Sequence, residues 1–557
     1  MMDASDIRRR FEVLKSQRKV VEEQWQAIEK FVAPYRGKFF REGVGESGIN
    51  WRENRDVYDA TAVQAHIQLA SSIHGALTNP AIRWFEMQWR DQKLRKDHAA
   101  QVWIEAAGKR VYDELQDSNF NLEANNCYRG LTSFATAVVI EEPNAEVTDD
   151  WEGVQFTSVP LKQAYFEPDD KGQCLNFYRH MRWRPSKIVA KFGIENVPDT
   201  VKQRYEGAGD DEMEIIFCVF TRNPGPQKPT GRVLTPENRP YGWKYVMRVG
   251  EDVVLQEGGY YEMPAFVCRW EITDESMWGN GPAHYAIADI LTLNQLVELD
   301  LKAREKVIDP ALLAQERAII NTLDLSPGAV NVVRDVSQFK AFESAARFDA
   351  TENSIVRLQR AIQKYFYIDQ LELKESPAMT ATEVQVRYEM MQRLLSSTMA
   401  RLKEDFLDPL LQRTFNLLYR AGELGDIPSS VQDANFDIEY IGPLSRSMKF
   451  DQSASIERWI TQLQLIAQMG PAAEAVMLVP DYDAIARQAA ANLNLPTELT
   501  RPQKDVKADM QAQKDQQARQ MSSQAAAAEA AAAKDLGQAQ QLRGGNQDIT
   551  GAGVPIQ

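Results

Sequence analysis

The first part of the chain carries the apolar pattern of amphipathic helices. Apolar residues recur at steps of three, four or seven over residues 7–32, which predicts a helix that ends before Pro34. The same spacing predicts further helices at about 60–77 and 98–115. Three amphipathic helices are therefore expected before any sheet.

Between about residues 137 and 270 the pattern changes to short alternating or β-branched runs that are separated by turns. These runs predict strands, and their order predicts an α+β domain whose helices come before its sheet. The runs lie at 137–142, 151–160, 175–185, 213–222, 244–258 and 263–270.

Helical spacing returns after Pro282. Residues 283–308 are apolar nearly all round in their first half, so this helix must be covered on more than one side. Its later part places Glu298 before Lys302 and Asp300 before Arg304 at i,i+4, the favourable order for ion pairs. At 1.5 Å per residue the helix would reach about 39 Å.

A small module and a second helix follow. Residues 309–347 form a unit too short to bury a sufficient core alone, so it needs a neighbouring subunit or a partner. The next helix is predicted at about 351–371. After a break at Ser376-Pro377, the capping box Thr380 to Glu383 predicts a helix that continues past a kink at Pro409.

The end of the chain is rich in Gln, Ala and Lys. Residues 501–557 have high helix propensity but almost no apolar stripe. Two alternatives stay open: a helix supported by copies of itself, or a disordered tail.

Composition excludes several protein classes. The 557 residues suffice for about three to four packed units. A net charge of −15 disfavours a protein that clamps DNA by neutralising phosphates. Four widely spaced cysteines fit reduced thiols better than a zinc site, and the longest apolar run, 135–140, is too short to span a membrane. We expect a soluble protein with no targeting segment.

Motifs for catalysis are scarce. The GxGxxG spelling at 43–48 lacks a strand before it and a helix after it, and no P-loop is present. The histidines, including His66 and His74, are expected to serve packing or the surface rather than a metal. Acidic doublets such as Asp169-Asp170 predict solvated turns, with a two-metal nuclease site as the alternative.

Basic and aromatic side chains alternate over residues 177–184. This cluster could stack on bases and hold phosphates. The favoured interpretation is an amphipathic strand whose Arg stems lie over aromatic rings.

Several short motifs follow one another in a distinctive order along the chain. They are Gly75 to Phe85, Ser118 to Phe120, Tyr260 to Trp270, Trp278 to Pro282, Ala288 to Gln295, Asp309-Pro310 and Pro327-Gly328. In this order they resemble one protein family, the portal or head-to-tail connecting proteins of short-tailed bacteriophages. The resemblance covers about residues 1–425.

The resemblance implies a predominantly helical α+β portal fold that assembles as a ring of about twelve subunits. The implied parts are the wing (1–282), a stem helix (283–308), the clip (309–347), a second stem helix (348–371), the tunnel loop (372–380), a long wing helix with the crown (381–500), and a barrel helix or tail (501–557).

The implied function is a non-enzymatic conduit at one capsid vertex, through which phage DNA is packaged and ejected. The implied partners are further copies of the chain, the large terminase ATPase, tail adaptor and tail tube proteins, and major capsid and scaffolding proteins, with double-stranded DNA passing through. The implied location is the virion, after assembly in the host cytoplasm. We expect no cofactor, no metal and no membrane contact.

The resemblance also suggests site residues. The tunnel loop offers a mixed rather than basic set, so its contacts with moving DNA should be weak. The loop candidates are Lys374, Glu375, Ser376 and Met379; the stem-lining candidates are Lys302, Arg304, Lys306, Arg357 and Arg360; the clip docking candidates are Arg317, Arg334 and Lys340.

The negative charge is unevenly distributed. Residues 141–170 and 195–214 together carry −13, whereas residues 283–371 carry only −2. Because salt screens charges over about 8 Å, acids on the outside of a ring would barely affect its bore. Two alternatives to a conduit stay open: a metal-dependent nuclease or nucleotidyl-transfer enzyme that uses Asp169 and Asp170, and a scaffold that does not touch DNA.

Overall fold

The computed structural model divides the chain into two compact units. The first comprises Met1–Arg95 and Trp103–Asp451, and the second comprises Lys96–Val102 and Gln452–Gln557. The structure describes residues 2–34, 55–144, 151–207, 209, 211–222, 234–273, 276–308, 312–314, 339–341, 348–368, 396–428, 431, 436–440, 443–468, 479–493, 495 and 497–544.

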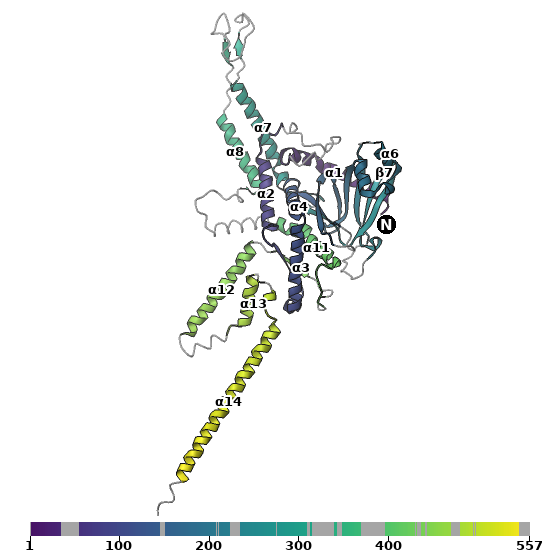
Figure 1. The fold of residues 1–557 in the computed structure, drawn as a ribbon. Coiled ribbons are helices and arrows are strands. Elements are labelled where there is room, and N and C mark those ends of the chain that lie inside the picture. The colour runs from purple at the N-terminus through teal and green to yellow at the C-terminus, as the bar shows by residue number, and fades with distance from the viewer. Residues whose placement is uncertain are drawn as a thin grey trace, which may run out of the picture. The chain divides into compact units, whose positions relative to one another are not determined.

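Four helices precede the main sheets among the described residues (Figure 1), and three of them confirm the predicted ranges. Helix α1 starts after Asp3, whose carboxylate accepts a hydrogen bond from the Ala4 amide at 2.7 Å. The fourth helix has no counterpart among the predicted elements. The four are α1 (Ala4–Phe31), α2 (Thr61–Leu77), α3 (His98–Asp117) and α4 (Phe120–Phe134), with a 3₁₀ turn at Leu94–Lys96.

All six predicted strand regions contain strands, and these form two antiparallel sheets. A three-stranded sheet has the order β3-β2-β9, and a five-stranded sheet has the order β4-β5-β6-β7-β8. The β7–β8 hairpin turns at Gly250, where φ is +78°. The strands are β2 (Thr136–Pro143), β3 (Val154–Val159), β4 (Ala164–Pro168), β5 (Cys174–Trp183), β6 (Met213–Thr221), β7 (Tyr241–Val249), β8 (Glu251–Tyr260) and β9 (Ala265–Arg269).

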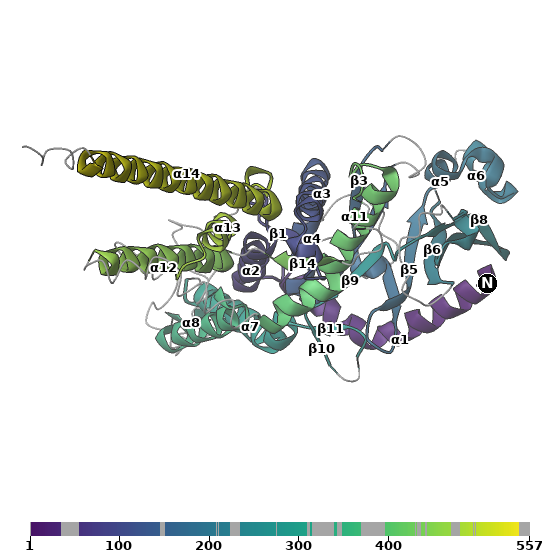
Figure 2. The same cartoon turned by 90° about the horizontal axis from the view of Figure 1, so that it is seen from below.

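Helices lie against both faces of the five-stranded sheet (Figure 2). Ile7 and Phe11 of α1 pack into a core with Tyr178 and Ile216 of the sheet. On the other face, the Phe192 ring of α5 lies 5.2 Å from that of Tyr245. The expectation that the helices precede the sheet is therefore wrong in part, because α5 (Pro185–Phe192) and α6 (Asp199–Glu206) are inserted between β5 and β6.

After the sheets, the chain forms a pair of long helices. Helix α7 (Pro282–Ile308) packs beside α8 (Phe348–Tyr365), as Figure 1 shows. Between them along the chain, β12 (Leu312–Ala314) pairs antiparallel with β13 (Phe339–Ala341). Helix α8 ends six residues before the predicted position, and Tyr367 just beyond it adopts the left-handed conformation with φ of +59°.

The next described helix continues past Pro409 to Ala421, as predicted, whereas its predicted start at the Thr380 to Glu383 capping box lies outside the described residues. Residues 396–402 lead into a π-helical segment at Lys403–Leu407 and then into α11 (Asp408–Ala421), which ends at Gly422. Helix α11 contacts the three-stranded sheet through a buried network: Thr414 Oγ1 lies 2.8 Å from Glu141 Oε1, and Arg413 Nε lies 3.8 Å from Glu141 Oε2.

One strand pair joins distant parts of the first unit. Strand β1 (Phe85–Trp89) pairs antiparallel with β14 (Phe436–Tyr440), and neither strand was predicted. The remaining short elements are β10 (Glu271–Ile272) with β11 (Gly279–Asn280), and 3₁₀ turns at Leu161–Gln163, Ile194–Asn196, Pro236–Asn238 and Thr497–Leu499.

The second unit is helical. It contains the later part of α12 (Pro443–Ala467), then α13 (Tyr482–Asn492) and α14 (Gln503–Gly544). The first turn of α3 belongs to this unit, and within the unit His98 Nε2 lies 2.8 Å from the Thr500 carbonyl oxygen. Within the chain end, residues 503–544 are helical, and every described side chain over 503–534 is exposed or half-buried.

Among the described helices, none is both long enough and apolar enough to cross a membrane.

Candidate functional site

The candidate residues fall into described and undescribed parts of the chain. Lys374, Glu375, Ser376 and Met379 of the tunnel-loop set lie outside the described residues, as do Arg317 and Arg334 of the clip set. Lys340 lies in β13, where its backbone pairs with Leu313 of β12. The five stem-lining candidates all lie on α7 and α8. The site is therefore built from this helix pair.

The cations of α7 are held by acids of the same helix. Lys302 Nζ lies 2.6 Å from Glu298 Oε1, and Arg304 Nε lies 2.6 Å from Asp300 Oδ2. These hydrogen bonds raise the pKa of both Lys302 and Arg304. The predicted i,i+4 pairs are thus formed, and the acids compensate two of the three α7 candidates.

Helix α8 carries a basic stripe without such compensation. Arg357, Arg360 and Lys364 are spaced at i, i+3 and i+7, so they share one exposed side of the helix. Among the described residues, none of these three forms an ion pair with an acid. The acids of α8, Asp349 and Glu352, lie in its first turns. The stem-lining candidates predicted from the sequence did not include Lys364, although its i+7 spacing from Arg357 could have indicated it.

One side of α7 is apolar and exposed. Leu293 is only 1% exposed, whereas Leu299 is 54% exposed and Val307 is 49% exposed. Thr292, Leu296, Leu299, Ala303 and Val307 follow one another at helical spacing along this side. Helix α7 contacts α8, α1, α4 and α2, yet this side of it stays exposed or half-buried within the described chain, so it is a surface that another molecule can cover.

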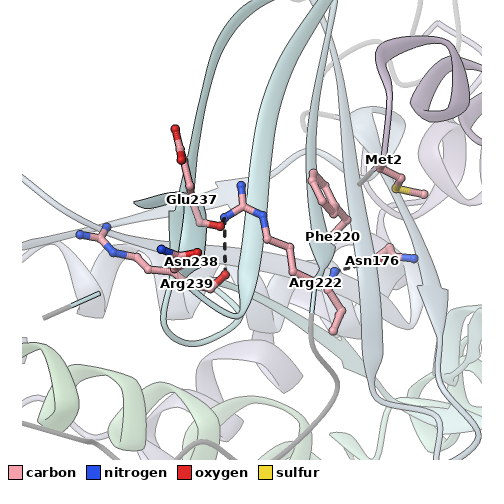
Figure 3. Close-up of a pocket in the computed structure, with 8 residues that line it drawn as sticks. Met2, Asn176, Phe220, Arg222, Glu237, Asn238 and Arg239 are labelled. Atoms are coloured by element: carbon pink, nitrogen blue, oxygen red, sulfur yellow. Dashed lines mark hydrogen bonds between the residues drawn. The ribbon is translucent and has the colours of Figure 1, made fainter. Parts of the chain in front are cut away.

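A described hollow lies elsewhere, beside strand β6 (Figure 3). It measures about 400 Å³ and is lined by Met2, Asn176, Phe220 and Arg222, among others. The Arg222 guanidinium donates to the carbonyl oxygens of Pro236 at 2.7 Å and Gly258 at 3.0 Å. Because the backbone already engages both Nη atoms of this cation, the hollow offers little to an anionic ligand.

The described residues do not assemble a metal-binding group. No cluster of three or more His, Cys, Asp or Glu side chains forms within the described ranges. Asp169 lies in a turn, where its Oδ1 accepts hydrogen bonds from the amides of Lys171 at 2.9 Å and Gln173 at 2.7 Å. His66 is buried 3.5 Å from Thr132 Oγ1. This turn and this packing histidine agree with the sequence interpretation.

Residues 177–183 of the basic and aromatic cluster belong to β5, and Arg184 precedes α5. Phe177, Tyr178 and Met181 are buried, so their side chains cannot stack on bases. Lys187 Nζ lies 4.8 Å from the centre of the Trp183 ring. The cluster is therefore part of a strand that is covered on both faces, and the cation over its Trp183 ring comes from α5 rather than from the predicted Arg stems.

Comparison with known proteins gives one family and two curated relatives. The family described as "Bacteriophage head to tail connecting protein" matches residues 4–500. The "Portal protein" of Salmonella phage epsilon15 is 24% identical over 472 residues, which covers 83% of this chain and 82% of that protein. The "Probable portal protein" of Bordetella phage BPP-1 is 24% identical over 515 residues, 90% of each chain.

Proposed function

Because the chain belongs to the family of bacteriophage head-to-tail connecting proteins, we propose that about twelve copies form a ring-shaped portal at one capsid vertex. Phage DNA would be packaged and later ejected through this ring. The observation that carries the proposal is the family match together with the exposed apolar side of α7.

A ring explains that apolar side physically. In a closed ring each subunit presents one surface to one neighbour and a different surface to the other. Burying an exposed Leu or Val side chain contributes roughly 1.5–3 kcal/mol, so covering Leu299 and Val307 would favour association. The side chains of helix α14 over 503–534 are exposed or half-buried, and they would gain a neighbour in the same way if residues 501–557 form a barrel.

The parts of the chain take the roles that the resemblance implies. Residues 1–282 are the wing, 283–308 and 348–371 the stem helices, 309–347 the clip, 372–380 the tunnel loop, and 381–500 the long wing helix with the crown. The clip would dock the terminase ATPase during packaging and tail adaptor proteins afterwards, with Arg317, Arg334 and Lys340 as contacts.

Within the stem, the basic stripe of α8 is the better candidate to face DNA. The α7 cations Lys302 and Arg304 are engaged by their own acids, whereas Arg357, Arg360 and Lys364 are free of described ion pairs. Each phosphate contact releases counterions, so such contacts weaken steeply with salt. A few of them per subunit would guide DNA without holding it firmly.

Electron microscopy of the purified full-length protein tests the ring. End-on views should show closed rings of about twelve subunits. A protein that stays monomeric under every assembly condition would contradict the proposal.

Charge neutralisation tests the stripe. Changing Arg357, Arg360 and Lys364 together to Gln should lower the amount of linear duplex bound by assembled rings and flatten its salt dependence. The matched control changes Lys302 and Arg304 to Gln, and it should alter binding less. Equal losses in both variants would show that the stripe has no special role.

A further inference from the structure

A short arm of the chain contacts both stem helices at once. Residues 55–60 precede α2, and four hydrogen bonds or ion pairs connect them to three helices. Two of these bonds reach α7 through Asn294, one reaches α8 through Gln359, and one reaches the end of α1 through Lys30.

Asn294 forms two hydrogen bonds with the arm, and we call this pair of bonds the Asn294 lock. Asn294 Oδ1 accepts a hydrogen bond from the Tyr58 amide at 2.7 Å, and its Nδ2 donates to the Asp56 carbonyl oxygen at 2.8 Å. The side chain is only 8% exposed although it is polar. Leaving a buried polar group unpaired costs about 1–3 kcal/mol. Rotating or sliding α7 away from the arm would leave these groups unpaired, so such a motion is strongly unfavourable.

Asp59 extends the lock to the second stem helix. Its Oδ2 accepts a hydrogen bond from Gln359 Nε2 at 2.9 Å, and its Oδ1 accepts one from the Thr61 amide at 2.8 Å. The same carboxylate therefore binds both the first amide of α2 and the Gln359 side chain of α8. Lys30 of α1 pairs with Asp56 at 2.8 Å and lowers the pKa of that carboxyl.

We propose that the arm, residues 55–60, is a clamp that sets the spacing and rotation of α7 and α8, with Asn294 and Gln359 as its positioning residues. Because α8 carries the basic stripe, the clamp also fixes the direction in which Arg357, Arg360 and Lys364 point. Only this consequence for DNA rests on the proposed portal function; the clamp itself does not.

The test measures the distance between the two stem helices directly. Spin labels at the exposed positions Glu305 and Ser354, in a Cys174→Ser background, report this distance. Labelled subunits are diluted with unlabelled ones before assembly. Hydrogen exchange of the Tyr58 amide reports the Asn294 bond in the same samples.

Two variants break the clamp at different points. Asn294→Leu removes both bonds to the arm, and Gln359→Glu places a second carboxylate against Asp59. The matched controls, Gln295→Glu on α7 and Asn353→Asp on α8, change exposed residues of the same helices.

Both clamp variants should broaden or shift the distance distribution, while both controls leave it unchanged. Exchange at Tyr58 should rise about tenfold in Asn294→Leu, the equivalent of about 1.4 kcal/mol. If Asn294→Leu does not fold, Gln359→Glu alone decides, because its site is half-buried. An unchanged distance in the folded variants would overturn the proposal, whether or not their stability falls. Absence of rings in the parent protein would instead count against the portal function.

Discussion

Replacing Glu141 by Gln should stabilise the folded subunit, and the gain should grow with pH. Glu141 lies in β2 with a fully buried side chain, and this burial raises its pKa from 4.5 to about 8. The neighbouring Arg413 and the hydroxyl of Thr414 act in the opposite direction without cancelling the burial. At neutral pH the carboxyl is therefore mostly protonated in the folded state and ionised in the unfolded state.

The sign and size of the change in the free energy of unfolding follow from proton linkage. A carboxyl whose pKa is raised by folding contributes its full stability below pH 4.5 and loses it as the pH rises toward about 8. Each pKa unit is worth about 1.4 kcal/mol, so the loss is below about 1 kcal/mol at pH 5 and about 3 kcal/mol at pH 7. Because Gln cannot ionise, the variant does not lose this stability as the pH rises.

Urea unfolding at pH 5, 6, 7 and 8, followed by far-ultraviolet circular dichroism, checks the prediction. The parent and variant are compared in the same assembly state, and the control is Glu206→Gln, which is exposed on α6. An amide facing Arg413 adds a constant offset but no pH dependence. A stability difference that stays flat from pH 5 to 8 would refute the reasoning, because Glu141 would then ionise normally beside Arg413.

Three further predictions concern stability and the tunnel loop. Changing Trp84 to Ala should lower the free energy of unfolding by about 3–5 kcal/mol, because Trp84 is 3% exposed and packs against Phe120 and Tyr440. Changing the 40% exposed Trp459 to Ala should cost far less, and urea midpoints compare the two variants. Arg18 donates hydrogen bonds to the carbonyl oxygens of residues 161, 162 and 164. Arg18→Met should therefore lower the free energy of unfolding by about 3 kcal/mol or more in the same assay. A loss below about 1 kcal/mol would show that water replaces these bonds. Deleting residues 374–379 should leave rings intact in electron micrographs while reducing DNA retention, and loss of rings would mean that the loop is structural.

Elements with a local signal were predictable from the sequence. The apolar stripes of α1 and α2 and the alternating runs of β5 and β6 gave nearly the observed ranges. Helix α4 was missed because Asn, Gly and Cys give its sequence low helix propensity, while burial of Phe120, Tyr128 and Leu131 stabilises it. Helices α5 and α6 span only eight residues each, too few for a clear period.

Contacts between distant segments could not be read from the chain. The pairing of β1 with β14 joins residues about 350 positions apart. The Asn294 lock joins α7 to a segment 236 residues earlier, and nothing near either residue indicates the other. At the stem, spacing alone predicted the pairing of Lys302 with Glu298. That Arg357 and Arg360 have no ion-pair partner among the described residues could be seen only in the folded structure.

The β1–β14 pair has a consequence for biosynthesis. Gln88 bonds to Glu439, 351 residues further along the chain. At about 5–20 residues per second, β1 leaves the ribosome roughly 20–70 s before its partner strand exists. During that interval Phe85, Met87 and Trp89, all buried in the finished fold, have no strand to complete their sheet. A nascent chain that terminates before residue 436 never completes it, so translation products of incomplete length should be diverted to aggregation or proteolysis, and full-length subunits should predominate in assembly.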